Sequence, residues 1–204
     1  MPRSIVAYFD YKSPYAYLAK DLTYKLAAET GVDVDWRPYT LDIPAYLGDA
    51  EVDADGKVVA ESRNAHQWRR VRYSYMDCRR HAERRGLVIR GPRKIFDSTT
   101  SHIGMLYAQR AGVFRPYHDA VFERFWKREL DIEDAGAIEA VLAEAGADPA
   151  GFGDFLAGEG RSELQRIIDD AHDSGIFGVP SFVLDDEIFW GREHLALIRE
   201  RLAG

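Results

Sequence analysis

The pattern of the first 38 residues constrains the fold of this chain more than any other feature of its sequence. Residues 4–9 (SIVAYF) predict a short buried strand, and a helical pattern runs from Pro14 to a stop at Gly31. The stretch 32–38 (VDVDWRP) alternates between apolar and polar residues, as a half-buried strand does. A strand, a helix and a strand in this order form a parallel pair with a right-handed crossover. The chain therefore begins with a βαβ unit.

The C-terminal end carries a different pattern, of two strands and one helix. The sequence SFVLDDEIFWG predicts a tight hairpin that turns at Asp185-Asp186, and residues 193–202 predict a closing helix. Residues 49–62 predict an acidic loop or a small hairpin. A long block between the two ends has helical patterns over residues 64–85, 99–111, 115–127, 132–145, 149–157 and 161–175.

Joined across this block, the βαβ unit and the ββα unit have the layout of a thioredoxin-like domain. We therefore predict an α/β fold in which residues 1–40 and 176–204 form a discontinuous thioredoxin-like domain. Residues 41–175 would form a large inserted all-helical domain. A length of 204 residues fits one domain, or one domain with such an insertion.

A proline directly before the first C-terminal strand needs an explanation, because proline cannot donate to a strand ladder. The sequence there is Gly178-Val179-Pro180-Ser181. One interpretation is an ordinary proline at the start of a strand. In thioredoxin-like folds, however, the corresponding proline is cis and faces the active site, and the preceding residue pairs through its backbone with a peptide-like ligand. The units on either side favour a cis Pro180 at a ligand site.

The tetrapeptide Ser13-Pro14-Tyr15-Ala16 lies where such folds carry Cys-x-x-Cys, at the N terminus of the first helix. Backbone N–H groups and the helix dipole favour an anion there, which is how a thiolate is stabilised. Ser13 cannot form a disulfide, but its hydroxyl can donate to the thiolate of a bound cosubstrate. Alternatively, Ser13 is only the helix N-cap, with Pro14 at the first helical position. Together with the proline motif, the tetrapeptide favours an active-site serine.

These motifs and several others resemble one known family. The motifs are Phe9-Asp10, Ser13-Pro14-Tyr15, Tyr17-Leu18-Ala19, Phe177-Gly178-Val179-Pro180-Ser181-Phe182 and Phe189-Trp190-Gly191. In the middle of the chain, Asn64, the helix over 73–86 and Asp97-Ser98 before Ile103-Gly104 also align. The sequence resembles the 2-hydroxychromene-2-carboxylate isomerase family, which belongs with the kappa-class glutathione transferases in the DsbA-like branch of the thioredoxin fold.

The resemblance implies a homodimer that binds reduced glutathione and interconverts a cis-configured aromatic pyruvate with its cyclic hemiketal carboxylate. Ser13 would hold the glutathione thiolate, which would add reversibly to the conjugated substrate, allow rotation about the former double bond, and leave. Val179 and Pro180 would bind the glutathione backbone. Asn64 and Asp97 are the candidates for contacts with the aromatic carboxylate substrate.

The resemblance also implies that Trp190-Gly191-Arg192-Glu193 holds the γ-glutamyl end of glutathione at the start of the last helix. The family usually carries a small amide or serine followed by Asp at the last two positions. In this chain, Arg192 would bind the carboxylate bidentately and Glu193 would bind the ammonium group.

Three other functions remain open at this stage. A kappa-like glutathione transferase would use the same site, and so would a non-catalytic module that binds a thiol ligand. A DsbA-like thiol oxidoreductase is disfavoured, because both active-site thiols are missing. Turnover of a cis-enone aromatic acid with and without glutathione would separate these alternatives.

The composition limits where the protein works. Its one cysteine excludes an internal disulfide and fits a reducing cytoplasm. The N terminus lacks an apolar region long enough for a signal peptide, and no apolar run approaches the roughly 20 residues that cross a membrane. We predict a cytoplasmic protein without a membrane partner.

Charge is distributed unevenly along the chain. The net charge is -7, yet the segment 63–94 contains ten arginines and one lysine against two acidic residues. We interpret this segment as a solvated helix face rather than a nucleic-acid surface, because no aromatic-rich binding module surrounds it. The third alternative is a positive rim that attracts small anions such as carboxylates.

Several weaker signals receive structural interpretations. The stretch that begins at Glu51 resembles a calcium loop but has Ser62 where the bidentate glutamate belongs, so we interpret it as a polar turn. The histidines show no metal-ligand spacing, and we expect no metal site. We interpret His118, beside Asp119, as a surface residue, and Cys78 as a half-buried structural cysteine rather than a reactive one.

Overall fold

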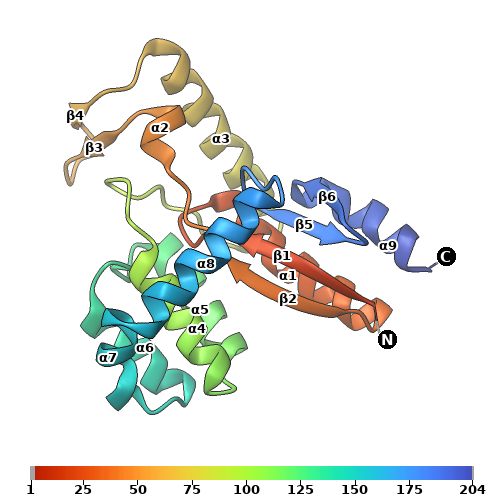
Figure 1. The fold of residues 1–204 in the computed structure, drawn as a ribbon. Coiled ribbons are helices and arrows are strands. Elements are labelled where there is room, and N and C mark those ends of the chain that lie inside the picture. Colours follow the sequence, from red (N-terminus) through yellow and green to blue (C-terminus); the bar gives the residue numbers. More distant parts are fainter. Residues whose placement is uncertain (1–2, 204) are drawn as a thin grey trace.

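Figure 1 shows the fold in a computed structural model, which describes residues 3–203. Its centre is a four-stranded mixed sheet with the strand order β2-β1-β5-β6. Strand β1 (Ser4–Phe9) pairs in parallel with β2 (Asp33–Pro38), as the βαβ pattern predicts. Strand β5 (Ser181–Leu184) is antiparallel to both β1 and β6 (Glu187–Trp190). This arrangement confirms the predicted α/β thioredoxin-like fold.

Local signals position the first helix and the last hairpin. Helix α1 (Pro14–Thr30) ends at Gly31, whose left-handed φ of 71° lets its N–H bond back to the last turn. The turn between β5 and β6 places both Asp185 and Asp186 at positive φ, 51° and 62°. Two such residues define the tight turn whose twist matches an antiparallel hairpin, so the predicted hairpin is confirmed.

The chain between β2 and β5 is mostly helical. Figure 1 shows two groups of elements joined by the segment 84–98: the β3-β4 hairpin with α2 and α3, and the cluster α4–α7. The elements are α2 (Ile43–Leu47), β3 (Ala50–Val52), β4 (Val58–Glu61), α3 (Ala65–Glu83), α4 (Thr99–Arg110), α5 (Phe114–Lys127), α6 (Ala135–Ala145), the 3₁₀ turn η1 (Pro149–Gly151), α7 (Phe152–Ala157) and α8 (Glu159–Asp173). Helix α8 packs against both α4 and β2, and so returns the chain to the sheet. A second 3₁₀ turn, η2 (Arg192–His194), precedes the last helix, α9 (Leu195–Ala203), which packs on α1.

The predicted helices of this block are present, with ends that differ by a few residues. Helix α2 was not predicted, because its five residues are too few to show a helical period. Its signals are local instead: Asp42 accepts a hydrogen bond from the N–H of Ala45 (3.2 Å), and Pro44 lies in the first turn. Residues 49–62 form the small antiparallel hairpin rather than a loop. No helix within residues 3–203 has the length and apolar character needed to cross a membrane.

The sheet and the helical block share one hydrophobic core. The ring of Tyr17 on α1 stacks on Phe122 of α5, with 5.5 Å between centroids, and Phe9 of β1 contacts the same ring. The Trp126 indole donates to the carbonyl of Tyr11 (3.1 Å), which ties α5 to the end of β1. The helical insertion is therefore packed directly onto the sheet. Its division from the sheet at residues 40/41 and 175/176 stays a prediction.

Candidate active site

Ser13 lies at the N terminus of α1 and is only 4% exposed. Its Oγ accepts a hydrogen bond from the N–H of Ala16 (3.2 Å), so the residue is the helix N-cap. A hydroxyl can accept and donate at the same time. Within residues 3–203 the Ser13 hydroxyl hydrogen has no acceptor, and the side chain lines a cavity. Capping the helix therefore leaves the donor of Ser13 free for a ligand.

The Val179-Pro180 peptide bond is cis, as the proline motif predicts. The Pro180 carbonyl accepts from the N–H of Gly191 (2.8 Å), and the Ser181 hydroxyl donates to the carbonyl of Gly178 (2.6 Å). Val179 precedes the strand, and within the described part of the chain its own N–H and C=O have no backbone partner. Val179 therefore offers one donor and one acceptor for an added strand.

Ser13 and Val179 line the same cavity, of about 1200 Å³. Trp190 also lines it, with an exposed indole that packs on Phe177 at 5.0 Å between ring centroids. These residues come from the β1-α1 turn, the segment before β5 and the end of β6. The cavity continues along α3 and the segment 91–96. It is large enough to hold two small molecules side by side.

The other residues proposed for the γ-glutamyl end lie beside the cavity rather than in its wall. Gly191 has a φ of 109°, and a Cβ there would lie 2.5 Å from the Glu193 carboxylate, so this turn requires glycine. Arg192 is half-buried, with its guanidinium 5.6 Å from the ring centroid of Tyr15. Glu193 is exposed at the start of η2. Tyr15 lines the cavity, so Arg192 adjoins it through that ring.

Asn64 and Asp97, the candidates for substrate contacts, both cap local backbone and do not line the cavity. Asn64 begins α3, where its side-chain oxygen accepts from the N–H groups of His66 and Gln67. The Asp97 carboxylate accepts from the N–H and hydroxyl of Thr99. The structure does not bring these two residues together with Ser13. Their role in substrate binding stays a prediction.

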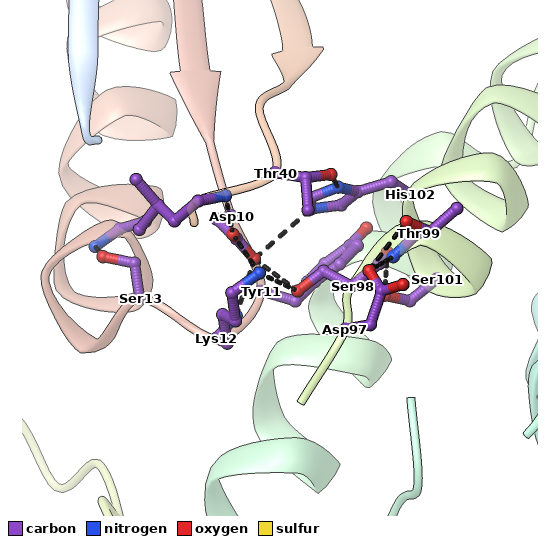
Figure 2. A network of polar contacts seen from close by, with 12 residues as sticks. Asp10, Tyr11, Lys12, Ser13, Thr40, Asp97, Ser98, Thr99, Ser101 and His102 are labelled. Carbon is purple, nitrogen blue, oxygen red and sulfur yellow. Dashed lines mark hydrogen bonds and ion pairs between the residues drawn. The ribbon is translucent and has the colours of Figure 1, made fainter. Parts of the chain in front are cut away.

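A buried ion pair between Asp10 and Lys12 lies next to Ser13, and the sequence motifs did not indicate it. Figure 2 shows Asp10, Lys12 and Ser98 pointing toward one another. The Lys12 ammonium lies 2.9 Å from Asp10 Oδ2, and the Ser98 hydroxyl donates to Asp10 Oδ1 (2.5 Å). Asp10 is fully buried, Lys12 is 5% exposed, and Lys12 also lines the cavity. The signal in the sequence was a charge on either side of Tyr11, where a buried strand ends.

The charge of Asp10 is stabilised by its partners. Burial by itself raises the pKa of the Asp10 carboxyl, but the Lys12 ammonium and the hydrogen bonds from Ser98 and the Leu41 N–H (2.8 Å) outweigh burial and lower it. Asp10 is therefore ionised at neutral pH. Its carboxylate fixes the Lys12 ammonium beside the N terminus of α1.

Two histidines lie in the core, and one corrects an expectation. His118 is fully buried among aromatic rings, not on the surface, with Nδ1 3.1 Å from the Tyr11 hydroxyl. The helical period places it on the inner face of α5, while Asp119 turns outward to the Lys20 ammonium (2.5 Å). His102 is also buried, and its Nδ1 lies 2.9 Å from the Thr40 hydroxyl. Burial lowers the pKa of His102 to about 4 and that of His118 well below its usual value, so both rings are neutral at neutral pH.

Cys78 lies on the inner face of α3 and is fully buried. Burial raises the pKa of its thiol to about 12, so the sulfur is protonated and not nucleophilic. The structural interpretation of Cys78 is thus favoured, with deeper burial than expected.

In the β3-β4 turn, Asp53 Oδ1 accepts from the N–H groups of Asp55 and Lys57, as in a polar turn. Residues 3–203 contain no group of three His, Cys, Asp or Glu side chains placed to hold a metal ion.

The fold is that of a thioredoxin-like protein, with Ser13 at the N terminus of its first helix and a cis proline before β5. Residues 4–203 match the DSBA-like thioredoxin domain, and the chain belongs to this family. A solved probable DsbA oxidoreductase from Streptomyces coelicolor shares the fold, with a TM-score of 0.77 at 20% identity over 98% of this chain and 88% of that one.

Within this family, the chain is similar over its whole length to 2-hydroxychromene-2-carboxylate isomerases. The protein of that name from Sphingobium xenophagum is 27% identical over 203 residues, which cover 99% of each chain. The one from Pseudomonas sp. (strain C18) is 28% identical, over 97% of this chain and 89% of that one. A solved 2-hydroxychromene-2-carboxylate isomerase superposes with a TM-score of 0.73 at 25% identity, over 98% of this chain and 94% of that one. The predicted resemblance of the chain to this isomerase family is confirmed, and these relatives support an isomerase.

Proposed function

We propose that this protein is a glutathione-dependent isomerase that interconverts the cis and trans forms of an aromatic pyruvate. One observation carries the proposal: Ser13, Val179 and Trp190 line a single cavity in a thioredoxin-like fold whose only cysteine, Cys78, is fully buried and does not line that cavity. Because no cysteine among residues 3–203 lines this cavity, it suits a ligand that supplies a thiol. The relatives that cover the whole chain are named as isomerases, which favours isomerisation over transfer.

The residues of the cavity fit glutathione. The free hydroxyl hydrogen of Ser13 suits a thiolate, and the unpaired N–H and C=O of Val179 suit a peptide backbone. When bound, glutathione would supply a thiolate that adds reversibly to a conjugated double bond and so permits rotation about it. The Lys12 ammonium lies beside this end of the cavity, and the N terminus of α1 adds its partial positive charge. Both favour the ionised form of a bound thiol.

The tasks of the remaining residues follow from their positions. Trp190 would cover one side of the tripeptide, and Arg192 with Glu193 would hold its amino-acid end. A transferase would use the same contacts, so only the product distinguishes the two activities. Thiol–disulfide exchange by the chain itself would need an accessible thiolate, whereas its one cysteine, Cys78, is fully buried and its pKa is raised by burial. A homodimer and a cytoplasmic location stay predictions.

A binding comparison tests the thiolate contact directly. Calorimetry at pH 8 would compare glutathione with S-methylglutathione, which has no ionisable thiol. We expect the wild type to prefer glutathione by roughly tenfold or more, the worth of one hydrogen bond to a charged group, and Ser13→Ala to lose that preference. Equal affinity for both compounds in the wild type would contradict the thiolate contact. Absence of binding would contradict glutathione as the ligand.

A further inference from the structure

The wall of the cavity that runs along α3 carries arginines that the chemistry at Ser13 does not use. Among residues 3–203, seven arginines line the cavity, and Glu83 is the only acidic residue that does. Arg80 pairs with Asp77 of its own helix. Within residues 3–203 the other six form no ion pair with an aspartate or glutamate: Arg63, Arg70, Arg72, Arg79, Arg93 and Arg128.

Elsewhere in the chain, arginines are commonly neutralised, as Arg85 is by Asp21 (3.1 Å) and Arg37 is by Asp35 (2.8 Å). The positive charge of the cavity wall is therefore a local feature. A concave surface of one sign concentrates ligands of the opposite sign. The sequence left open a positive rim that attracts small anions, and in the structure such a rim lies along this cavity.

Two of the unpaired arginines are fixed by one short segment of backbone. The Nε of Arg79 donates to the carbonyl of Ile89 (3.3 Å), and the Nε of Arg128 donates to the carbonyl of Gly91 (2.7 Å). Helix α3 and the end of α5 thereby each bond through a guanidinium group to the segment 89–91. Within the described residues, the Nη groups of Arg79 have no acceptor. These donors are available to a ligand.

Tyr75 and Arg63 complete the cluster. Arg79 lies 5.7 Å from the Tyr75 ring centroid, and that ring packs against Gly91, where a Cβ would lie 3.2 Å from it. Burial raises the pKa of the Tyr75 hydroxyl to about 12, although the charges of Arg63, Arg79 and Arg128 all act to lower it. Arg79 therefore packs on a half-buried phenol that stays protonated, and Arg63 and Arg128 line the same cavity wall. Burial, together with the charges of Arg93 and Arg79, also lowers the pKa of Arg128.

The backbone of Arg128 is unusual as well. Its φ is 62°, a left-handed conformation that ends α5 and is normally taken by glycine. An L-residue other than asparagine or aspartate seldom adopts this conformation, because its Cβ then lies close to the following carbonyl oxygen. The residue that adopts it is the one whose guanidinium donates to the Gly91 carbonyl. An arginine there is explained by a task for its side chain rather than by its backbone.

We propose that Arg63, Arg79 and Arg128, with the hydroxyl of Tyr75, bind a dianionic group on an aromatic ligand. A single carboxylate would leave at least two of the three charges uncompensated, whereas a dianion neutralises most of them. Guanidinium groups bind planar carboxylates and phosphates through paired hydrogen bonds. Aromatic side chains complete this part of the wall, among them Trp68 and Phe96. Two adjacent carboxylates and a phosphate ester share this chemistry.

This site goes beyond the glutathione reaction and does not depend on it, so it is tested without glutathione. Calorimetry at pH 8 would compare phthalate and phenyl phosphate, which are dianions, with benzoate, a monoanion of similar size. We expect at least one dianion to bind roughly tenfold or more tightly than benzoate, as for one additional charge-assisted hydrogen bond. A preference for phthalate would identify a dicarboxylate ligand, and a preference for phenyl phosphate would identify an ester.

Variants locate the site. Arg79→Gln and Arg128→Gly should each weaken binding of the preferred dianion by roughly tenfold. Glycine suits the left-handed backbone of residue 128, so this variant should fold. The matched control is Arg69→Gln on the same helix, an exposed arginine outside the cavity wall, which should bind like the wild type.

Two results would overturn the site. One is equal affinity for benzoate and both dianions. The other is an equal loss of binding in Arg69→Gln, which would indicate attraction by the charge of the whole helix. A short single-stranded oligonucleotide is a further probe. If it binds more tightly than either dianion and Arg69→Gln weakens it equally, the arginines form a nucleic-acid surface instead.

Discussion

At the scale of the residue, Ser13 combines two roles that the sequence presented as alternatives. Its oxygen caps α1 by accepting from Ala16, and within residues 3–203 its hydroxyl, which lines the cavity, has no acceptor for its hydrogen. A cysteine at this position would also face the helix N terminus, but it would cap the helix less well, because sulfur is a weak acceptor. The N-cap interpretation is thus correct, and it is compatible with a role in binding a thiolate.

Ser13→Ala should lower isomerisation by tenfold to a hundredfold, because a hydrogen bond to a charged group contributes about 1.5–3 kcal/mol. The lost cap should cost about 1 kcal/mol of stability, a decrease in Tm of roughly 2–4 °C for a chain of this size. Steady-state kinetics and thermal unfolding measure the two effects separately.

The matched control is Asp134→Ala. Asp134 caps α6 by accepting from the N–H of Ala137 (3.0 Å), and it does not line the cavity. This variant should lose similar stability and keep full activity. If Ser13→Ala retains wild-type turnover, Ser13 is only a cap.

At the scale of the element, a buried polar layer joins the turn after β1 to the start of α4. Asp10 and Lys12 come from the turn, and Ser98 and His102 come from the beginning of α4 (Figure 2). His102 Nε2 lies 3.5 Å from Asp10 Oδ1, yet burial keeps the imidazole neutral. Each buried charge in the layer has an opposite partner, which is the condition for burying charges at all.

This layer predicts a loss of stability in mild acid. The pKa of His102 is lowered from 6.5 to about 4 in the folded state, so the unfolded chain binds a proton first as the pH falls. The stability that depends on the neutral ring is complete above pH 6.5 and decreases as the pH falls toward 4. Between pH 7 and pH 5 this residue should account for a loss of about 2 kcal/mol.

Urea unfolding at the two pH values measures this effect. His102→Gln keeps a polar partner for Thr40 but cannot titrate, so it should lose about 2 kcal/mol less than the wild type over the same interval. An identical loss in both proteins would mean that another group, such as His118, controls the acid response.

The 3₁₀ turn η2 contains Arg192, the residue proposed to bind the γ-glutamyl end of glutathione. If Arg192 binds the carboxylate of the γ-glutamyl end, Arg192→Ala should weaken glutathione binding by roughly tenfold, the value of one charge-assisted hydrogen bond. Stability should change little, because Arg192 makes no ion pair within residues 3–203. Calorimetric titration measures the affinity, and Arg199→Ala, on α9, is the control. Unchanged affinity in Arg192→Ala would remove η2 from the site.

At the scale of the whole molecule, the sequence predicted most of the fold because its signals are local and agree with one another. The βαβ start, the Gly31 stop and the Asp185-Asp186 turn each have a backbone cause that a short window of sequence contains, whereas the cis Pro180 was predicted from the units on either side of it. Ser13 and Val179, which motifs at the two ends of the chain predict, meet in one cavity because β1 and β5 are neighbours in the sheet.

What could not be predicted depends on contacts between distant segments. His118 looked like a surface residue because its neighbour Asp119 is charged, but its burial is decided by the packing of α5 on the sheet. The arginines of α3 likewise looked like a solvated face, because they are charged and recur at helical spacing. Their place in a cavity wall depends on the segment 89–93 and the end of α5, which a helical period cannot reveal.

The most direct test of the central claim is turnover of a cis-configured aromatic pyruvate, followed by absorbance with and without glutathione. We predict that isomerisation requires glutathione, that its concentration is unchanged after many turnovers, and that S-methylglutathione cannot replace it, because the thiolate adds and leaves again. Equal rates without glutathione would contradict this account. Consumption of glutathione in proportion to product would contradict it as well, and would assign the site to a transferase.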